Sequence, residues 1–166
     1  EAGFAAGVKA VNPEAEVLVQ YAGAFDKPDI GKTIAATQYN DGADIIFQAA
    51  GATGTGVFNE ATERFNTGNK VWVIGVDKDQ SLEFGNDVTL TSMMKGVKEA
   101  VHKVSTDLIN GTWAGGTTVE LGLKDNAVGL PEANPNVPQD VLDKVNEYKE
   151  KIVSGEVTVP TTPEGK

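Results

Sequence analysis

The sequence has 166 residues and a formal net charge of −10, from 14 Lys and Arg against 24 Asp and Glu, and it contains no Cys. A chain of this length, with 40% hydrophobic residues, is long enough for about one globular domain. The acidic excess argues against nucleic acid or an anionic bilayer as a partner, because Lys and Arg neutralise phosphates in such complexes. The lack of Cys excludes disulfides, Cys-ligated zinc, iron–sulfur clusters and thiol nucleophiles.

The first half of the chain alternates between amphipathic helices and apolar strands. Apolar spacings of three and four predict a helix that ends at Val11, and strand formers predict a strand at 16–21. A second helix is expected from a cap at Asp29 to about residue 41, followed by a short apolar strand at 43–50. Residues 1–11 show neither an initiator Met nor a signal-peptide pattern, so we expect the chain to be a piece of a longer protein.

The same unit then repeats. We expect a helix opened by Gly51–Gly56, strands at 71–76, 88–92 and 117–121, and helices at about 94–109 and 139–154, with a frayed tail after Val159. Strands that alternate with helices predict an α/β fold with a doubly wound parallel sheet.

In such a sheet, ligands bind at the carboxyl ends of the strands. The sequence places Phe25, Gly51, Asp77 and Lys95 after four successive predicted strands. An aromatic face can stack on a flat base, a carboxylate can accept hydrogen bonds from hydroxyl groups, and an ammonium can donate them. The glycines could let the backbone approach a small ligand and donate N–H groups. This set fits a nucleoside or a sugar better than a phosphate ester.

Each of these residues also has a plainer interpretation. Phe25 could plug its loop onto the core, Asp77 could cap the next turn, and Lys95 could be an exposed lysine at a helix start. The glycine segment fits neither nucleotide-phosphate motif, because Asn59 stands where a dinucleotide fingerprint needs its third Gly and Val57 where a P-loop needs Lys.

The sequence offers no convincing catalytic set, and no cofactor or metal is predicted. The single His102 lies in a predicted helix without a neighbouring nucleophile, which favours a plain surface or packed histidine. Ser92 and Lys95 match a Ser-x-x-Lys pattern whose companion motifs are missing.

Several segments together resemble the basic membrane protein (BMP) family of substrate-binding lipoproteins, which includes the purine nucleoside receptor of spirochaetes and serves ABC transporters. They are Glu1-Ala-Gly-Phe-Ala-Ala-Gly-Val, Tyr21-Ala-Gly-Ala-Phe-Asp, Gly42-Ala-Asp-Ile-Ile-Phe-Gln-Ala-Ala-Gly-Ala-Thr-Gly-Thr-Gly-Val-Phe, Val73-Ile-Gly-Val-Asp, Leu90-Thr-Ser-Met-Met-Lys and Gly155-Glu-Val-Thr-Val-Pro. They follow one another over nearly the whole chain.

The resemblance implies a type I periplasmic-binding-protein fold with two Rossmann-like lobes, of which this chain is the C-terminal lobe without the N-terminal one. Residues 1–86 and 122–160 would then form that lobe, 87–121 would be a crossover belonging to the missing lobe, and 161–166 would be a tail. By the same resemblance, Phe25 stacks on the base, Asp77 and Lys95 bind the ribose, and Gly51 approaches the sugar.

The resemblance also implies an extracytoplasmic, non-enzymatic solute-binding component that delivers a purine nucleoside or related ribosyl ligand to an ABC transporter permease. Its membrane attachment would be a lipid anchor upstream of this chain. From the residues alone, a sugar- or nucleoside-processing α/β enzyme and a regulatory lobe without a small ligand stay open as alternatives.

Overall fold

A computed structural model describes residues 1–163 of the chain, so the last part of the predicted tail, 164–166, lies outside the described residues. The strands are β1 (Ile45–Phe47), β2 (Trp72–Asp77), β3 (Thr89–Lys95) and β4 (Val128–Gly129), and the helices are α1 (Ala2–Val11), α2 (Pro28–Asn40), α3 (Thr55–Asn66), α4 (Ser81–Phe84), α5 (Val97–Ile109) and α6 (Gln139–Ser154). Two short 3-10 turns are η1 (Gly51–Gly54) and η2 (Leu123–Asp125). The predicted alternation of strands and helices is confirmed from α2 to α5.

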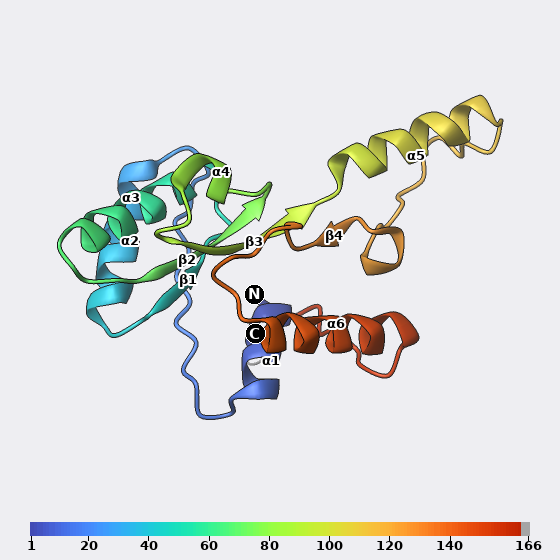
Figure 1. The fold of residues 1–166 in the computed structure, drawn as a ribbon. Helices are drawn as coiled ribbons and strands as arrows, with labels where there is room; N and C mark the ends of the chain where they lie inside the picture. Colours follow the sequence, from blue (N-terminus) through green and yellow to red (C-terminus); the bar gives the residue numbers. More distant parts are fainter. Residues whose placement is uncertain (164–166) are drawn as a thin grey trace.

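The sheet has the order β1-β2-β3-β4. β2 pairs in parallel with β1 and with β3, and β4 adds to β3 in the antiparallel direction. The α/β class with a mainly parallel sheet is therefore confirmed. Helices α2 and α3 lie side by side on one flank of the sheet (Figure 1).

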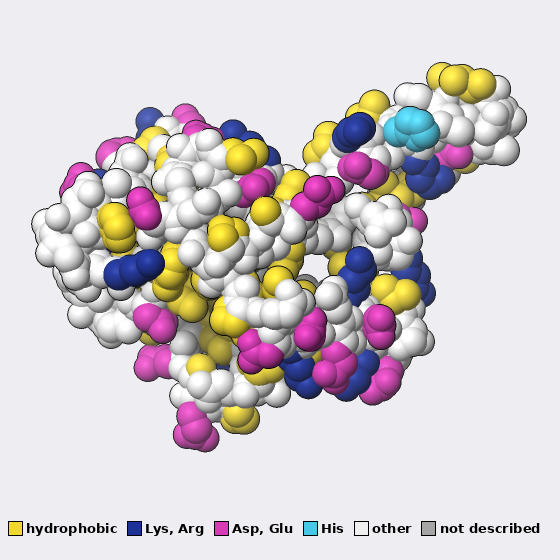
Figure 2. Space-filling view, in the orientation of Figure 1, with side chains coloured by type: hydrophobic (Ala, Val, Ile, Leu, Met, Phe, Trp, Pro, Cys, Tyr) yellow, Lys and Arg dark blue, Asp and Glu magenta, His cyan; other side chains and the backbone are white. Residues whose placement is uncertain are grey.

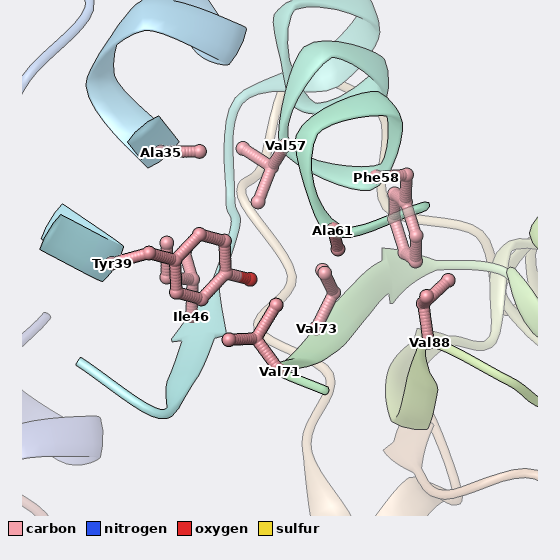
Figure 3. Close-up of a cluster of buried hydrophobic side chains, with 9 residues drawn as sticks. All are labelled: Ala35, Tyr39, Ile46, Val57, Phe58, Ala61, Val71, Val73 and Val88. Atoms are coloured by element: carbon pink, nitrogen blue, oxygen red, sulfur yellow. The ribbon is translucent and has the colours of Figure 1, made fainter. Parts of the chain in front are cut away.

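The hydrophobic core lies between these two helices and the sheet (Figure 3). Its buried members are Ala35, Tyr39, Ile46, Val57, Phe58, Ala61, Val71, Val73 and Val88. The Phe58 ring is fully buried and stacks on Phe84 of α4, with ring centroids 4.1 Å apart. The Tyr39 hydroxyl donates to Trp72 O at 3.0 Å, and burial raises the pKa of this phenol. The core therefore fixes β1, β2 and the start of β3 against α2 and α3.

Some element boundaries differ from the predicted ones. The second helix begins at Pro28, which is well suited to the first helical position, so Asp29 lies in the first turn and is not the cap. β3 continues to Lys95, and α5 starts at Val97 rather than at about residue 94. The reason is tertiary: Met94 lies opposite Asp77 of β2, and Lys95 lies opposite Val128 of β4.

Two predicted strands are absent from the described structure. Residues 16–21 and 117–121 have strand-forming side chains but no assigned strand, and most of them are exposed. A strand is stabilised by its hydrogen-bonded neighbour, and within residues 1–163 neither segment is paired in the sheet.

The chain leaves the sheet after Lys95, later than the boundary predicted at residue 87, because β3 belongs to the same sheet as β2. From there α5 reaches away from the body, and Figure 2 shows hydrophobic side chains on the surface of this arm. No residue of α5 is buried, and Val97, Val101 and Leu108 are 65%, 60% and 64% exposed. Among the described helices, none is long and apolar enough to cross a membrane.

Truncation of Phe58 tests the core. We expect Phe58→Ala to lower the free energy of unfolding by about 3–5 kcal/mol, because it removes a fully buried ring and that ring's stacking on Phe84. Urea denaturation measures this value. Leu82→Ala on α4, where the side chain is 87% exposed, is the control and should stay within about 0.5 kcal/mol of the parent. Equal losses in both variants would contradict this description of the core.

Candidate functional site

Phe25 lies on a loop that a single buried threonine holds in place. Thr53 of η1 donates its hydroxyl to Ala24 O at 2.9 Å and accepts from Lys27 N at 2.9 Å, and its backbone N donates to Phe25 O at 3.1 Å. Phe25 itself is 73% exposed, so its ring does not plug the loop onto the core. These hydrogen bonds of Thr53 hold the backbone on both sides of Phe25, while the Phe25 ring remains in solvent.

Gly51, at the start of η1, lies directly against this loop. Its φ is +57°, and a Cβ at this position would lie 3.2 Å from Phe25 O. Gly54 and Gly56 have a different role: a Cβ on Gly54 would overlap Gln48 Oε1, and one on Gly56 would overlap Pro28 O. The close approach that these two glycines permit is thus to other parts of the chain. The prediction that glycine brings the backbone close to a ligand remains a prediction for Gly51.

Asp77 and Lys95 meet at the carboxyl ends of β2 and β3. Asp77 Oδ1 lies 2.9 Å from Lys95 Nζ, and each side chain is 54% exposed. Asp77 has φ +71°, a left-handed conformation that is uncommon for residues other than Gly, Asn and Asp. Lys95 is the last residue of β3, so its expected place at a helix start is wrong. Water screens an ion pair this exposed, so it stabilises the fold by only about 0–1 kcal/mol.

A network of buried polar groups connects the ends of the three parallel strands near Gly51, Asp77 and Lys95. Gln48 Nε2 donates to Gln80 Oε1 at 2.6 Å, and the same oxygen accepts from Val76 N at 2.9 Å. Gln80 N donates to Ser92 Oγ at 3.0 Å. The side chains come from the residue after β1, from the turn after β2 and from β3, so the network links all three parallel strands near their carboxyl ends.

The four predicted residues thus form two contacting pairs, Phe25 with Gly51 and Asp77 with Lys95. Together they offer an aromatic face, backbone groups, a carboxylate and an ammonium, all accessible to solvent. Two hollows lie elsewhere, between residues 120–125 and α6, and one of them has a volume of about 450 Å³.

The structure also shows where the other candidate catalytic and metal-binding residues lie. His102 lies on the exposed surface of α5, where it is drawn in cyan in Figure 2. Residues 1–163 contain no group of three or more His, Cys, Asp or Glu side chains able to hold a metal ion. Ser92 is fully buried and accepts a hydrogen bond from Gln80, which explains it as a structural group.

Thr53, Gln48 and Gln80 did not stand out in the sequence. One signal was present for Gln48, since it is a polar residue inside the apolar run 43–50. Thr53 and Gln80 lie in polar loop segments where many side chains are exposed, and only the tertiary contacts distinguish them.

Comparison with known proteins identifies the family of this chain. The family model described as "ABC transporter substrate-binding protein PnrA-like" matches residues 1–163. The "CD4+ T-cell-stimulating antigen" of Listeria monocytogenes is 50% identical over 98% of this chain and 48% of that protein. The "ABC transporter nucleoside-binding protein BmpA" of Lactococcus lactis is 39% identical over 97% of this chain and 48% of that protein.

A solved structure adds agreement at the level of the fold. An ABC transporter solute-binding protein from Aeropyrum pernix K1 has a TM-score of 0.77 and 27% identity, over 93% of this chain and 51% of that one. The chain spans about half the length of the curated relatives it matches. The resemblance read from the sequence motifs is confirmed, and the chain belongs to the PnrA-like family of ABC transporter substrate-binding proteins.

Proposed function

We propose that this chain is one lobe of an extracytoplasmic solute-binding protein that holds a purine nucleoside or a related ribosyl ligand for uptake by an ABC transporter. The observation that carries the proposal is the half-exposed Asp77–Lys95 pair at the carboxyl edge of the parallel sheet. Membership of the substrate-binding family and the name of the Lactococcus relative, a nucleoside-binding protein, support it.

The proposed binding mode divides the ligand between the two pairs. The base stacks on the exposed ring of Phe25, and Gly51 lets the backbone come close to the sugar. Asp77 accepts hydrogen bonds from ribose hydroxyl groups, and Lys95 donates one while it remains paired with the carboxylate. The nucleoside would replace water on side chains that are already oriented, and no bond is made or broken.

The rest of the proposal concerns the longer protein. A second lobe would close over the ligand by hinge motion, and the loaded protein would deliver it to a permease. An upstream lipid anchor would hold the protein at the outer side of the membrane. The segment from 97 to 121 would pack on the second lobe, because the apolar side of α5 lies in solvent in this chain.

Titration of the full-length protein tests the stacking residue. We expect Phe25→Ala to weaken binding of inosine, guanosine or adenosine by about 1–3 kcal/mol, because the base loses its stacking partner. Isothermal titration calorimetry gives the affinity, and Phe25→Trp should retain it. Leu82→Ala, which also changes an exposed apolar residue, is the matched control and should bind like the parent. Release of free base in a parallel product assay would instead support the nucleoside-processing enzyme.

Asp77→Asn separates binding from folding. Asn tolerates the left-handed backbone of this position, and the lost ion pair is exposed, so the free energy of unfolding should change by no more than about 1 kcal/mol. Binding of nucleoside and of free ribose should both fall about tenfold or more, because a charged acceptor for the sugar is lost. Calorimetry and urea denaturation of the same preparation measure the two effects. Unchanged ribose and nucleoside affinities would remove Asp77 from the site.

A separate experiment tests whether a second lobe covers the apolar side of α5. In the full-length protein, we expect Leu108→Ala to lower the free energy of unfolding by about 2–5 kcal/mol, as truncation of a buried leucine does. Urea denaturation measures the loss, and Leu82→Ala is again the comparison because it makes the same change on a surface outside α5. A loss within about 0.5 kcal/mol for Leu108→Ala would show that this face of α5 stays in water.

A further inference from the structure

Two glutamine side chains form a buried contact between loops that are distant in the sequence. Gln48 and Gln80 are 4% and 7% exposed, and Gln48 Nε2 donates to Gln80 Oε1 at 2.6 Å. Gln48 follows β1 and Gln80 lies in the turn after β2. We call this contact the glutamine bridge.

Each end of the glutamine bridge holds the backbone beside a candidate ligand-binding residue. Gln48 Oε1 accepts from the backbone N of Ala50 at 3.2 Å, next to Gly51. Gln80 Oε1 accepts from the backbone N of Val76 at 2.9 Å, next to Asp77. A continuous path of hydrogen bonds therefore runs from the backbone before Gly51 to the backbone before Asp77.

Two glycines leave room for the side chains of Gln48 and Gln80. A Cβ on Gly54 would overlap Gln48 Oε1, and a Cβ on Gly75 would lie 2.7 Å from Gln80 Oε1 and 2.6 Å from Ser92 Oγ. Ser92 also accepts from Gln80 N and lies in β3, three residues before Lys95. The two glycines and Ser92 thus hold the glutamine bridge in one orientation.

A merely stabilising role explains this arrangement poorly. Buried amides gain little net free energy from their hydrogen bonds, and apolar side chains of similar shape would fill the same space. What a fully satisfied polar network provides is a single geometry. Such support also favours the left-handed backbone of Asp77, which Asp adopts less often than extended or helical conformations.

We propose that Gln48 and Gln80 are positioning residues that hold the two halves of the site, Phe25 with Gly51 and Asp77 with Lys95, at a fixed separation. A nucleoside spans both halves, so a fixed separation lowers the entropy lost on binding. Free ribose occupies only the Asp77 half and gains nothing from the separation. The assignment of ligand parts to the two halves rests on the function proposed above, whereas the mechanical coupling of the two loops does not.

Amide hydrogen exchange of the full-length protein without ligand tests the coupling. Gln80→Met removes the shared acceptor, and we expect exchange to become about tenfold faster at Val76 and also at Ala50, whose backbone N donates to Gln48 Oε1. Gln80→Glu keeps an oxygen that can accept both hydrogen bonds and should preserve slow exchange at both amides. Ser81→Ala removes a hydrogen bond to Asp79 in the same turn and is the matched control, with no change expected at Ala50.

A second variant, Gln48→Met, tests the same coupling if Gln80→Met does not fold. Gln48→Met leaves the bond from Val76 N to Gln80 Oε1 in place but removes the glutamine bridge, so faster exchange at Val76 would again show coupling. Acceleration confined in each variant to the loop that carries the substitution would overturn the proposal.

Titration of the same proteins with inosine and with ribose tests the effect on the site. In Gln80→Met we expect the inosine dissociation constant to rise about tenfold and the ribose constant to change by less than about threefold. Equal weakening of both ligands, or an unchanged inosine affinity in a variant whose loops have become uncoupled, would overturn the positioning role. A parent protein that binds no nucleoside would contradict the proposed function alone, and the exchange result would still decide whether the glutamine bridge couples the loops.

Discussion

The pairing of β2 with β1 on one side and β3 on the other is the constraint on which the rest of the structure depends. Because the three strands run in parallel, the residues that follow them collect at one edge of the sheet. The register places Asp77 opposite Met94, so the Lys95 ammonium comes within reach of the Asp77 carboxylate. The core beneath α2 and α3 holds this register, because a slip of one residue would turn Val73 out of it.

The carboxyl edge of the sheet combines buried polar groups with exposed charged ones. Gln48, Gln80 and Ser92 are buried and hydrogen-bonded, whereas Asp77 and Lys95 are about half exposed. The buried groups are rigid because each has its partners, and the exposed groups remain free to exchange water for another partner. This division is what a protein needs if it binds and releases a small molecule without changing it.

Some apolar surface lies outside the core of this chain. The side of α5 that carries Val101 and Leu108 is exposed, and residues 16–21 have strand-forming side chains but form no strand in the described structure. These features agree with a chain that spans about half the length of its curated relatives.

The sequence by itself determined the α/β class, the family and the order of helices and strands from α2 to α5, because these depend on local periodicity and on motifs read along the chain. It also placed Gly51 shortly after β1 and Asp77 at the end of β2, whereas no strand precedes Phe25 and Lys95 is the last residue of β3. Only the tertiary structure decided that β3 extends to Lys95, that Phe25 is exposed and that Gly54 makes room for Gln48. Those outcomes depend on contacts between residues far apart in the chain, and single-residue preferences carry no information about which partners the fold brings together.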